Sequence, residues 1–303
     1  MRKGKRWLAA AVSAAMIVQS LASVGPVYAA DDGVSIADTF TDSSFRSYVS
    51  SNFDTDSNGY LSDAEISNVT SIDVSKCSPA ISSLNGVELF TNLSKLDCNE
   101  QSIRNLDIEN LENLEYIDVS SNRIDSLTLP VSAEKLTYLD ISGNKITSLT
   151  SLADYNNLVL LNANSTNLSS IDVSNMKGLK VLGVSGTTIS TLDLGSNMEL
   201  TTLYCDSMRS LPVLDVSGHE KLKNLYCAGA KSDSGVVVRS SITKLDVSGD
   251  IVLGSLDCSN SYVAELNIDN TPALTTLDCS NTRLTSIDVS KNTSPSYLDV
   301  SRN

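Results

Sequence analysis

The strongest constraint on the fold of this chain is a repeat of about 21 residues that begins at Leu93 and continues to the C-terminus. Consecutive units start 21 or 22 residues apart, except for one step of 31 residues between Leu222 and Leu253. The ten units begin at Leu93, Leu114, Leu136, Leu158, Leu179, Leu200, Leu222, Leu253, Leu274 and Pro295. Repeats at this nearly constant spacing indicate a stack of similar coils, each of which contacts only its neighbours.

Each unit predicts a short β-strand with one buried face. In Leu96-Asp97-Cys98, as in the matching segments of other units, apolar residues alternate with a polar residue. This is the period of a half-buried strand, and a strand so short cannot bury its apolar face unless the coils stack in parallel. A second half of ten or eleven residues repeats the pattern within the unit, as at 103–108 and 242–247. We therefore expect a mostly β solenoid with strands on both faces and little helix outside the N-terminus.

The pattern L-x-x-L-x-[LVC]-x-x-N-x-L resembles the leucine-rich repeat, and the doubled L-D-V-S half resembles the nested bacterial subclass of 21 residues. The resemblance covers about two thirds of the chain and implies leucine-rich repeats stacked in parallel coils. The consensus asparagine, which bonds the backbone where the chain leaves the strand, is present at Asn122, Asn144 and Asn303. In the other units its place is taken by Gln101, Thr166, Thr187, Met208, Ala230, Ser261 and Thr282. This departure leaves the rigidity of the turns open.

The first 30 residues have the order of a secretory signal peptide. Four basic residues precede an apolar stretch at 7–21, and Val27-Tyr28-Ala29 has the small residues of a cleavage site. A membrane anchor is the alternative, but polar residues interrupt the stretch and it is short for a bilayer. No later segment approaches the ~20 apolar residues of a spanning helix, so we expect an exported chain without membrane insertion.

The chain is strongly acidic, with a net charge of −14 that becomes about −18 without the four basic residues of 1–30. Nucleic acids and anionic lipid heads require clustered Lys and Arg. We therefore expect no nucleic-acid partner, whereas divalent cations are compatible with this charge.

Residues 54–65 match the calcium-binding loop of an EF-hand position by position. Oxygen ligands in this order suit a hard ion that takes six to eight contacts, and Gly59 would make the sharp turn. The expected ligands are the side chains of Asp54, Asp56, Asn58, Ser62 and Glu65 and the backbone carbonyl of Tyr60. Ser62 would bind directly or through water, and Glu65 would bind with both oxygens.

The segments around this loop predict a helical cap. Asp42 can begin a helix whose apolar face carries Phe45, Tyr48, Val49 and Phe53, whereas the helix after the loop has barely two turns. This order, with the junction at 81–96, resembles the EF-hand-like cap of internalin-type surface proteins and of other exported Gram-positive leucine-rich-repeat proteins. The resemblance implies a calcium-bound cap. A cap without a stable ion is the alternative, and dockerin modules use such loops in pairs, whereas one is present here.

Five of the six cysteines occupy the inward strand position that Val, Ile or Ala fills in other units. They are Cys98, Cys205, Cys227, Cys258 and Cys279, while Cys77 falls in a loop. We expect free, buried thiols that act as small core residues. A disulfide between neighbouring coils stays an alternative, because a coil spacing of ~4.8 Å lies within the disulfide range.

Catalysis is not expected. The single histidine, His219, lies in a turn, and most Asp residues recur at one repeat position instead of forming a unique site.

Two features mark where a partner would bind. The exposed position between the inward residues is mostly acidic, but Tyr204 and Tyr226 are neighbours there, and Tyr116 and Tyr138 are neighbours on the next row. Exposed tyrosines are enriched at interfaces, although Tyr is also an ordinary strand residue. The second feature is the insertion at 228–241, because insertions in solenoids often lie on a binding face.

We divide the chain into a signal peptide at 1–30, an EF-hand-like cap at 34–70 and a solenoid at 71–303 that ends inside a unit, as if truncated. The predicted function is protein or glycan recognition by a non-enzymatic protein, secreted or at the surface of a Gram-positive bacterium, with calcium in the cap. The alternative is an N-terminal targeting or scaffold region of a larger extracellular enzyme or adhesin.

Overall fold

The computed structural model describes residues 33–149, 152, 154–231, 236–292 and 296–303. Residues from Gly33 to Asn303 form one compact unit. The expected signal peptide at 1–30 lies outside the described residues. In the part of the chain that is described, no helix is both long and apolar enough to cross a bilayer.

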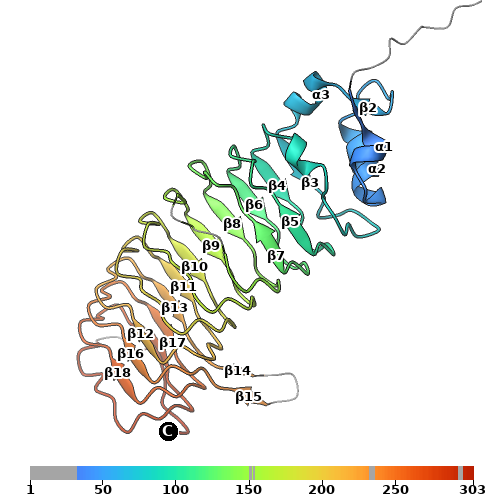
Figure 1. Ribbon diagram of the computed structural model, residues 1–303. Coiled ribbons are helices and arrows are strands. Elements are labelled where there is room, and N and C mark those ends of the chain that lie inside the picture. The colour runs from blue at the N-terminus through green and yellow to red at the C-terminus, as the bar shows by residue number, and fades with distance from the viewer. Residues whose placement is uncertain (1–32, 150–151, 153, 232–235, 293–295) are drawn as a thin grey trace, which may run out of the picture. The chain divides into compact units, whose positions relative to one another are not determined.

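Three short helices and a two-stranded ribbon form the cap that precedes the repeats (Figure 1). The helices are α1 (Ile36–Thr39), α2 (Ser43–Asn52) and α3 (Asp63–Asn68), and β1 (Val34–Ser35) pairs antiparallel with β2 (Tyr60–Leu61). Asp42 begins α2 as expected, because one carboxylate oxygen accepts hydrogen bonds from the N–H groups of Ser44 (2.9 Å) and Phe45 (3.1 Å). The exit helix α3 is short, as predicted.

Aromatic rings fill the core of the cap and join it to the first coil. The Phe40 ring lies 5.5 Å from the Phe45 ring and 6.0 Å from the Phe90 ring, between centroids. Phe90 directly follows the 3-10 helix η1 (Val87–Leu89), which starts after Gly86. A Cβ atom at Gly86 would lie 2.5 Å from the Phe40 ring, and its φ of +98° also favours glycine.

Eleven parallel strands form the main sheet, one in each successive coil. In order they are β3 (Ser71–Asp73), β4 (Lys95–Asp97), β6 (Tyr116–Asp118), β8 (Tyr138–Asp140), β9 (Leu160–Asn162), β10 (Val181–Gly183), β11 (Thr202–Tyr204), β13 (Asn224–Tyr226), β17 (Ser255–Asp257), β19 (Thr276–Asp278) and β20 (Tyr297–Asp299). From β3 to β19 the middle residue of each strand is buried, and the first and third residues form two rows on the outer face. The predicted mostly β solenoid is confirmed.

Shorter sheets lie on the opposite face of the coils. β5 (Asn105–Asp107) pairs with β7 (Ser126–Thr128), and β12 (Val213–Asp215), β16 (Lys244–Asp246) and β18 (Glu265–Asn267) form a second group. The matching segments 171–173 and 192–194 are not strands. There, the Asn197 side chain donates directly to the carbonyls of Val173 (2.9 Å) and Met176 (3.0 Å), so a side chain replaces strand pairing between these coils.

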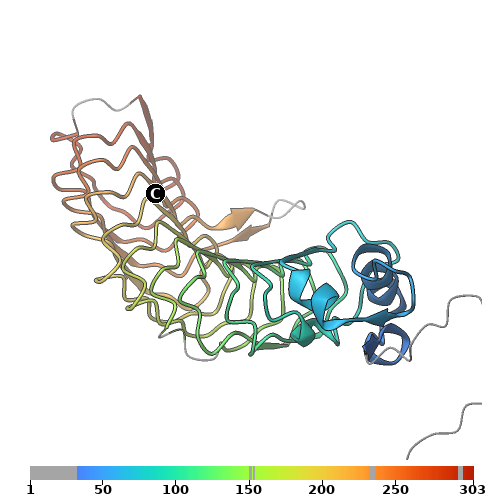
Figure 2. The ribbon, with the colours of Figure 1, turned by 90° about the horizontal axis from the view of Figure 1, so that it is seen from above.

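The insertion predicted at 228–241 forms a hairpin that leaves the stack (Figure 2). β14 (Ala230–Lys231) pairs antiparallel with β15 (Val237–Val238). Arg239, which follows the hairpin, donates to the carbonyl oxygens of Ser261 (2.8 Å) and Asn281 (2.7 Å), in the next two coils. The base of the hairpin is therefore tied to the stack.

The five cysteines predicted to face inward are completely buried, and all six cysteines are free thiols. Burial raises the pKa of the Cys279 thiol to about 11, with a further contribution from Asp278. These thiols therefore behave as small core residues at neutral pH.

The consensus asparagines join neighbouring coils through hydrogen bonds to the backbone. The Asn144 amide donates to the carbonyl of Val119 in the preceding coil (2.9 Å), and its oxygen accepts from the N–H of Ile124 (2.9 Å). Thr187 occupies the same position in a later coil and donates to the carbonyl of Val184 within its own coil (2.7 Å). The Asn144 side chain thus bonds the backbone of the neighbouring coil, whereas the Thr187 hydroxyl bonds the backbone of its own coil.

Candidate functional site

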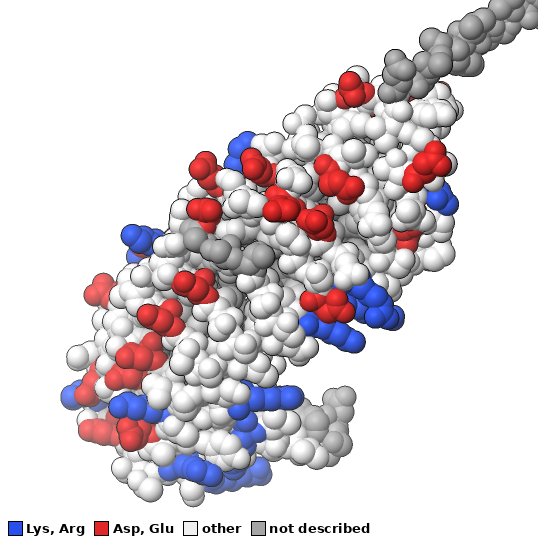
Figure 3. Space-filling model, in the orientation of Figure 1, with Lys and Arg blue, Asp and Glu red and all other residues white. Residues whose placement is uncertain are grey.

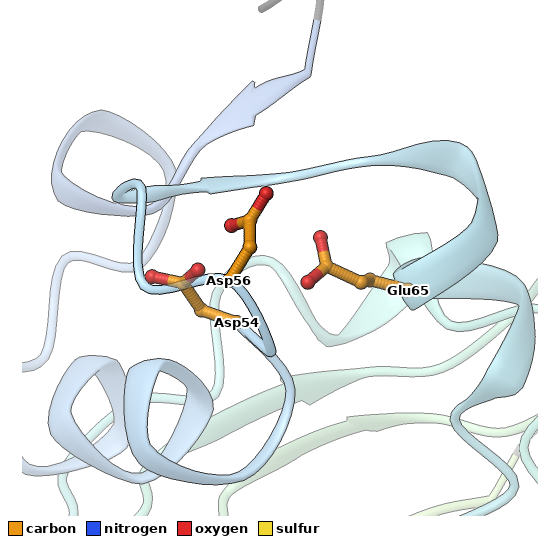
Figure 4. Close-up of side chains that lie close together, drawn as sticks. All are labelled: Asp54, Asp56 and Glu65. Atoms are coloured by element: carbon orange, nitrogen blue, oxygen red, sulfur yellow. The ribbon is translucent and has the colours of Figure 1, made fainter. Parts of the chain in front are cut away.

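The loop after α2 brings together three of the carboxylates predicted as metal ligands (Figure 4). Asp54 and Asp56 lie on this loop, and Glu65 lies in the first turn of α3. One oxygen atom of each carboxylate lies within 4.8 Å of those of the other two. Oxygens that bind one Ca²⁺ at about 2.3–2.6 Å must lie within about 5 Å of one another. The three carboxylates therefore fit a single hard cation.

Hydrogen bonds from backbone N–H groups to the Asp54 carboxylate hold this loop in a tight turn. The two oxygens of the buried Asp54 accept from the N–H groups of Asn58 (3.1 Å) and Gly59 (3.0 Å). Gly59 has a φ of +87°, and a Cβ atom there would meet no atom within 4 Å. The backbone conformation, and not a lack of space, requires glycine at this position.

Glu65 reaches back across the loop. One of its oxygens accepts from the N–H and hydroxyl of Thr55 (both 2.6 Å), and the other accepts from the N–H and hydroxyl of Ser62 (both 2.9 Å). These hydrogen bonds, that of the Thr55 hydroxyl first, lower the pKa of Glu65 to about 2. The carboxylate is consequently ionised at neutral pH and directed toward the loop.

The remaining predicted ligands also lie on the loop. The Asn58 side-chain oxygen accepts from the N–H of Tyr60 (2.7 Å), and Ser62 begins α3. The Tyr60 side chain is exposed, and its backbone carbonyl stays the candidate ligand that the sequence predicted. These oxygens have second lone pairs, so an ion can share them with the existing bonds.

The third residues of the main strands form an acidic row on the outer face. The row consists of Asp73, Asp97, Asp118, Asp140, Asn162, Gly183, Tyr204, Tyr226, Asp257, Asp278 and Asp299. An aspartate oxygen in this row accepts from the N–H two residues later, as in Asp118–Ser120 (3.0 Å) and Asp257–Ser259 (2.9 Å). This Asx turn ends each strand and explains why Asp and Ser recur together. Figure 3 shows carboxylates and basic side chains along the whole stack, with several of the Lys and Arg side chains near the C-terminal coils.

The four tyrosines predicted to contact a partner form two stacked pairs. The rings of Tyr116 and Tyr138 are 4.2 Å apart with an interplanar angle of 10°, and those of Tyr204 and Tyr226 are 5.0 Å apart with an angle of 4°. The first pair is partly buried, whereas Tyr204 is 38% exposed. The structure brings each pair together and places the two pairs at separate coils.

Sequence reasoning missed the charged residues beside these pairs. Lys95 lies over the Tyr116 ring (5.2 Å to the centroid), and its ammonium is 3.6 Å from Asp97 and 3.8 Å from Asp73. Asp206 lies in the turn that follows β11, two residues after Tyr204. The repeat spacing could have revealed the Lys95 contact, because registered strands align equivalent residues such as Lys95 and Tyr116.

His219 is buried on the opposite face. Its ring nitrogens lie 2.7 Å from the Val216 carbonyl oxygen and 3.2 Å from that of Leu194, in the preceding coil. Its backbone N–H donates to the buried Asp250. These are contacts of a side chain that joins coils.

Residues 112–154 match the family model for two copies of leucine-rich repeats. A comparison with curated protein sequences gives no significant match.

Solved structures of Listeria monocytogenes internalins resemble the chain over most of its length. InlF is 19% identical and aligns over 89% of this chain and 98% of its own, with a TM-score of 0.52. Internalin C2 is 15% identical over 89% of this chain and 97% of its own, with a TM-score of 0.53. The functional domain of InlJ, described as including a cysteine ladder, is 24% identical over 88% and 75%, with a TM-score of 0.38.

The family match lies within the stacked coils, and InlF and internalin C2 share their architecture at low sequence identity. The chain therefore carries leucine-rich repeats and has the internalin fold.

Proposed function

We propose that this chain is a non-enzymatic recognition protein, secreted or held at the cell surface, that binds a protein or glycan through the outer face of its main sheet. The observation that carries the proposal is the presence of two stacked tyrosine pairs on that face. Stacked rings on registered strands lose little freedom on binding, and tyrosine is frequent in binding hot spots. Eleven aligned strands present this chemistry over a continuous surface.

The experiment is to measure binding of the labelled chain to arrays of extracellular protein domains and of glycans. Saturable binding to at least one probe is expected, and replacement of Tyr116, Tyr138, Tyr204 and Tyr226 by Ser abolishes it. A matched control replaces Val213, exposed on the opposite face, by Ser and leaves binding unchanged. Equal losses in the two variants would refute the sheet face as the binding surface.

The cap loop adds a calcium site to this function. Asp54, Asp56, Asn58, Ser62 and Glu65 would supply side-chain oxygens, and Tyr60 its carbonyl. The support is the convergence of three carboxylates within 4.8 Å on a loop whose turn is already formed. An ion there would neutralise mutually repelling carboxylates and connect the end of α2 to the start of α3, which stabilises the cap.

Calcium binding is tested by thermal unfolding in calcium and in chelator. A ligand that binds only the folded chain stabilises it by about 2.7 kcal/mol at 100 times Kd, so the Tm should rise with calcium concentration. Glu65→Ala removes the expected bidentate ligand and the rise, whereas Asp63→Asn changes an exposed carboxylate of the same loop and preserves it. An unchanged Tm at millimolar calcium in the parent chain would exclude the site.

A further inference from the structure

Tyr204 and Tyr226 stand where most other coils carry a carboxylate. They end β11 and β13, are partners in the strand register and lie in the third-residue row between Gly183 and Asp257. Their parallel rings stack on each other, so the aromatic surface that they offer in this otherwise acidic row is the outer face of each ring. Aromatic faces carry negative electrostatic potential, so this surface attracts cations as well as apolar groups.

Two carboxyl groups flank this aromatic pair. Asp206 follows Tyr204 by two residues and accepts from the N–H of Ala228 in the next coil (2.9 Å). In coils whose row residue is an aspartate, that aspartate accepts the N–H of the residue two positions later, as Asp257 does from Ser259. The row residue Tyr226 has no carboxylate, so the N–H of Ala228 donates to Asp206 instead. Asp257 is the registered partner of Tyr226. Burial first, and then the charge of Asp257, raise the pKa of Asp206 to about 6, against the hydrogen bond from Ala228, which lowers it.

These carboxyl groups have no ion-pair partner within the described residues. Of the five ion pairs there, none involves Asp206 or Asp257. The first residues of the surrounding strands are neutral, namely Thr202, Asn224 and Ser255. The pair and its two carboxyls thus form a negative surface to which no described residue supplies an ion pair.

The other tyrosine pair shows how this chain uses the same components. There the ammonium of Lys95 lies 5.2 Å from the Tyr116 centroid and within 4 Å of two row aspartates. A cation of the chain itself, the Lys95 ammonium, thus lies near both the tyrosine ring and the two carboxylates. At Tyr204 and Tyr226 the rings and carboxylates recur in a different arrangement, and no described Lys or Arg lies over these rings.

We infer that Tyr204, Tyr226, Asp206 and Asp257 bind a lysine or arginine side chain of a partner protein. The inference rests on the proposed recognition function and names the chemistry of one contact. Charge complementarity selects the partner, since the chain carries a net charge of −14 and this surface adds two carboxyls to two aromatic faces. A neutral glycan could stack on the rings but would leave the carboxyls without a counter-charge.

The test uses the full chain and two probes, a tetralysine peptide and the same peptide with all side chains acetylated. Tetralysine should bind more tightly by about tenfold or more, and added salt should weaken it. Tyr204→Leu and Tyr226→Leu should each raise its Kd about two- to fivefold. The double variant Asp206→Asn, Asp257→Asn should raise it about tenfold, because Asn keeps the acceptor oxygens and removes both charges.

A double variant of equal charge provides the control. Asp288 and Asp299 each accept an N–H two residues later, as Asp257 does, and lie away from the pair. Asp288→Asn with Asp299→Asn should change Kd less than twofold. Equal weakening by the two double variants, or equal binding of the acetylated probe, would overturn the inference and reveal diffuse attraction or apolar binding. Either result would leave array binding through the sheet face intact, so the two proposals fail separately.

Discussion

The backbone N–H of His219 donates a 2.8 Å hydrogen bond to the carboxyl group of Asp250, which lies 31 residues later and in the next coil. Asp250 is completely buried, and its second oxygen has no hydrogen-bond partner among the described residues. It stands at the position where Asn197 and Asn292 use an amide to join coils. A protonated carboxyl group can imitate that amide, whereas a carboxylate has no hydrogen to donate.

Stability should therefore fall as pH rises. Burial, the largest cause, raises the pKa of Asp250 from 3.8 to about 8, so at neutral pH the folded chain binds a proton that the unfolded chain has released. Between pH 3.8 and about 8 the free energy of unfolding falls by up to about 1.4 kcal/mol per pH unit. Above the pKa of the folded chain it falls no further.

Asp250→Asn should remove this dependence while it keeps the acceptor for His219. Urea midpoints at pH 5, 6, 7 and 8 should diverge progressively between parent and variant. Asp193→Asn, at an exposed carboxylate of the same face, serves as control and should run parallel to the parent. A constant gap across this range would contradict the assignment.

Loss of the Asp42 carboxylate should loosen the cap from the repeats. One oxygen caps α2, and the other accepts from the N–H (2.9 Å) and hydroxyl (2.7 Å) of Ser82 at the junction. Although burial opposes it, these hydrogen bonds, those of Ser82 foremost, lower the pKa of Asp42. Asp42→Ala should cost about 2 kcal/mol, as a lost helix cap plus a lost charged hydrogen bond.

Hydrogen exchange locates the effect of Asp42→Ala. Amides of α2 and of the junction should exchange faster, whereas those of β8 to β11 should not change. Ser47→Ala, which removes an exposed hydroxyl on the same helix, should leave both regions unaltered. Uniformly faster exchange along the stack would argue against a local role of the Asp42–Ser82 contact.

Asn144→Thr should cost more stability than Thr187→Ser at the equivalent position of a later coil. It leaves the buried N–H of Ile124 and carbonyl of Val119 without their partner, at about 1–3 kcal/mol for each unsatisfied group. Thr187→Ser keeps the hydroxyl that bonds its own coil and should cost under about 1 kcal/mol. Chemical unfolding of the two variants measures the difference, and similar costs would show that the turns do not differ.

Two glycines with positive φ should respond differently to alanine. Gly86→Ala adds a Cβ atom 2.5 Å from the Phe40 ring, whereas Gly59→Ala places it in open space. Both changes carry the strain of left-handed backbone, about 1–2 kcal/mol, and only Gly86→Ala adds a clash in the cap core. Calorimetry in chelator should therefore give the larger fall in Tm for Gly86→Ala, and equal falls would mean that Phe40 moves away.

Much of this protein is readable from the chain alone, because its information is local and repeated. Period-two patterning placed the strands, and the 21-residue spacing required parallel stacking, since no coil can bury Leu96 or its equivalents alone. The spacing predicted that Asp54, Asp56 and Glu65 lie close together, since one tight loop determines their geometry. The calcium and partner roles themselves remain predictions.

Contacts between coils depend on register and on burial, which spacing alone does not supply. Packing decided whether the Asn197 side chain or a strand joins two coils. Packing also decided that Asp250 lies buried against His219. The contacts of Lys95 with Tyr116 and of Asp206 with the N–H of Ala228 likewise arise only when residues 21 or 22 positions apart are placed side by side. The repeat by itself determined the coil and its inward face, because those follow from local sequence period. Tertiary structure alone decided which polar groups meet across coils, because their free energy depends on desolvation and on partners from other units.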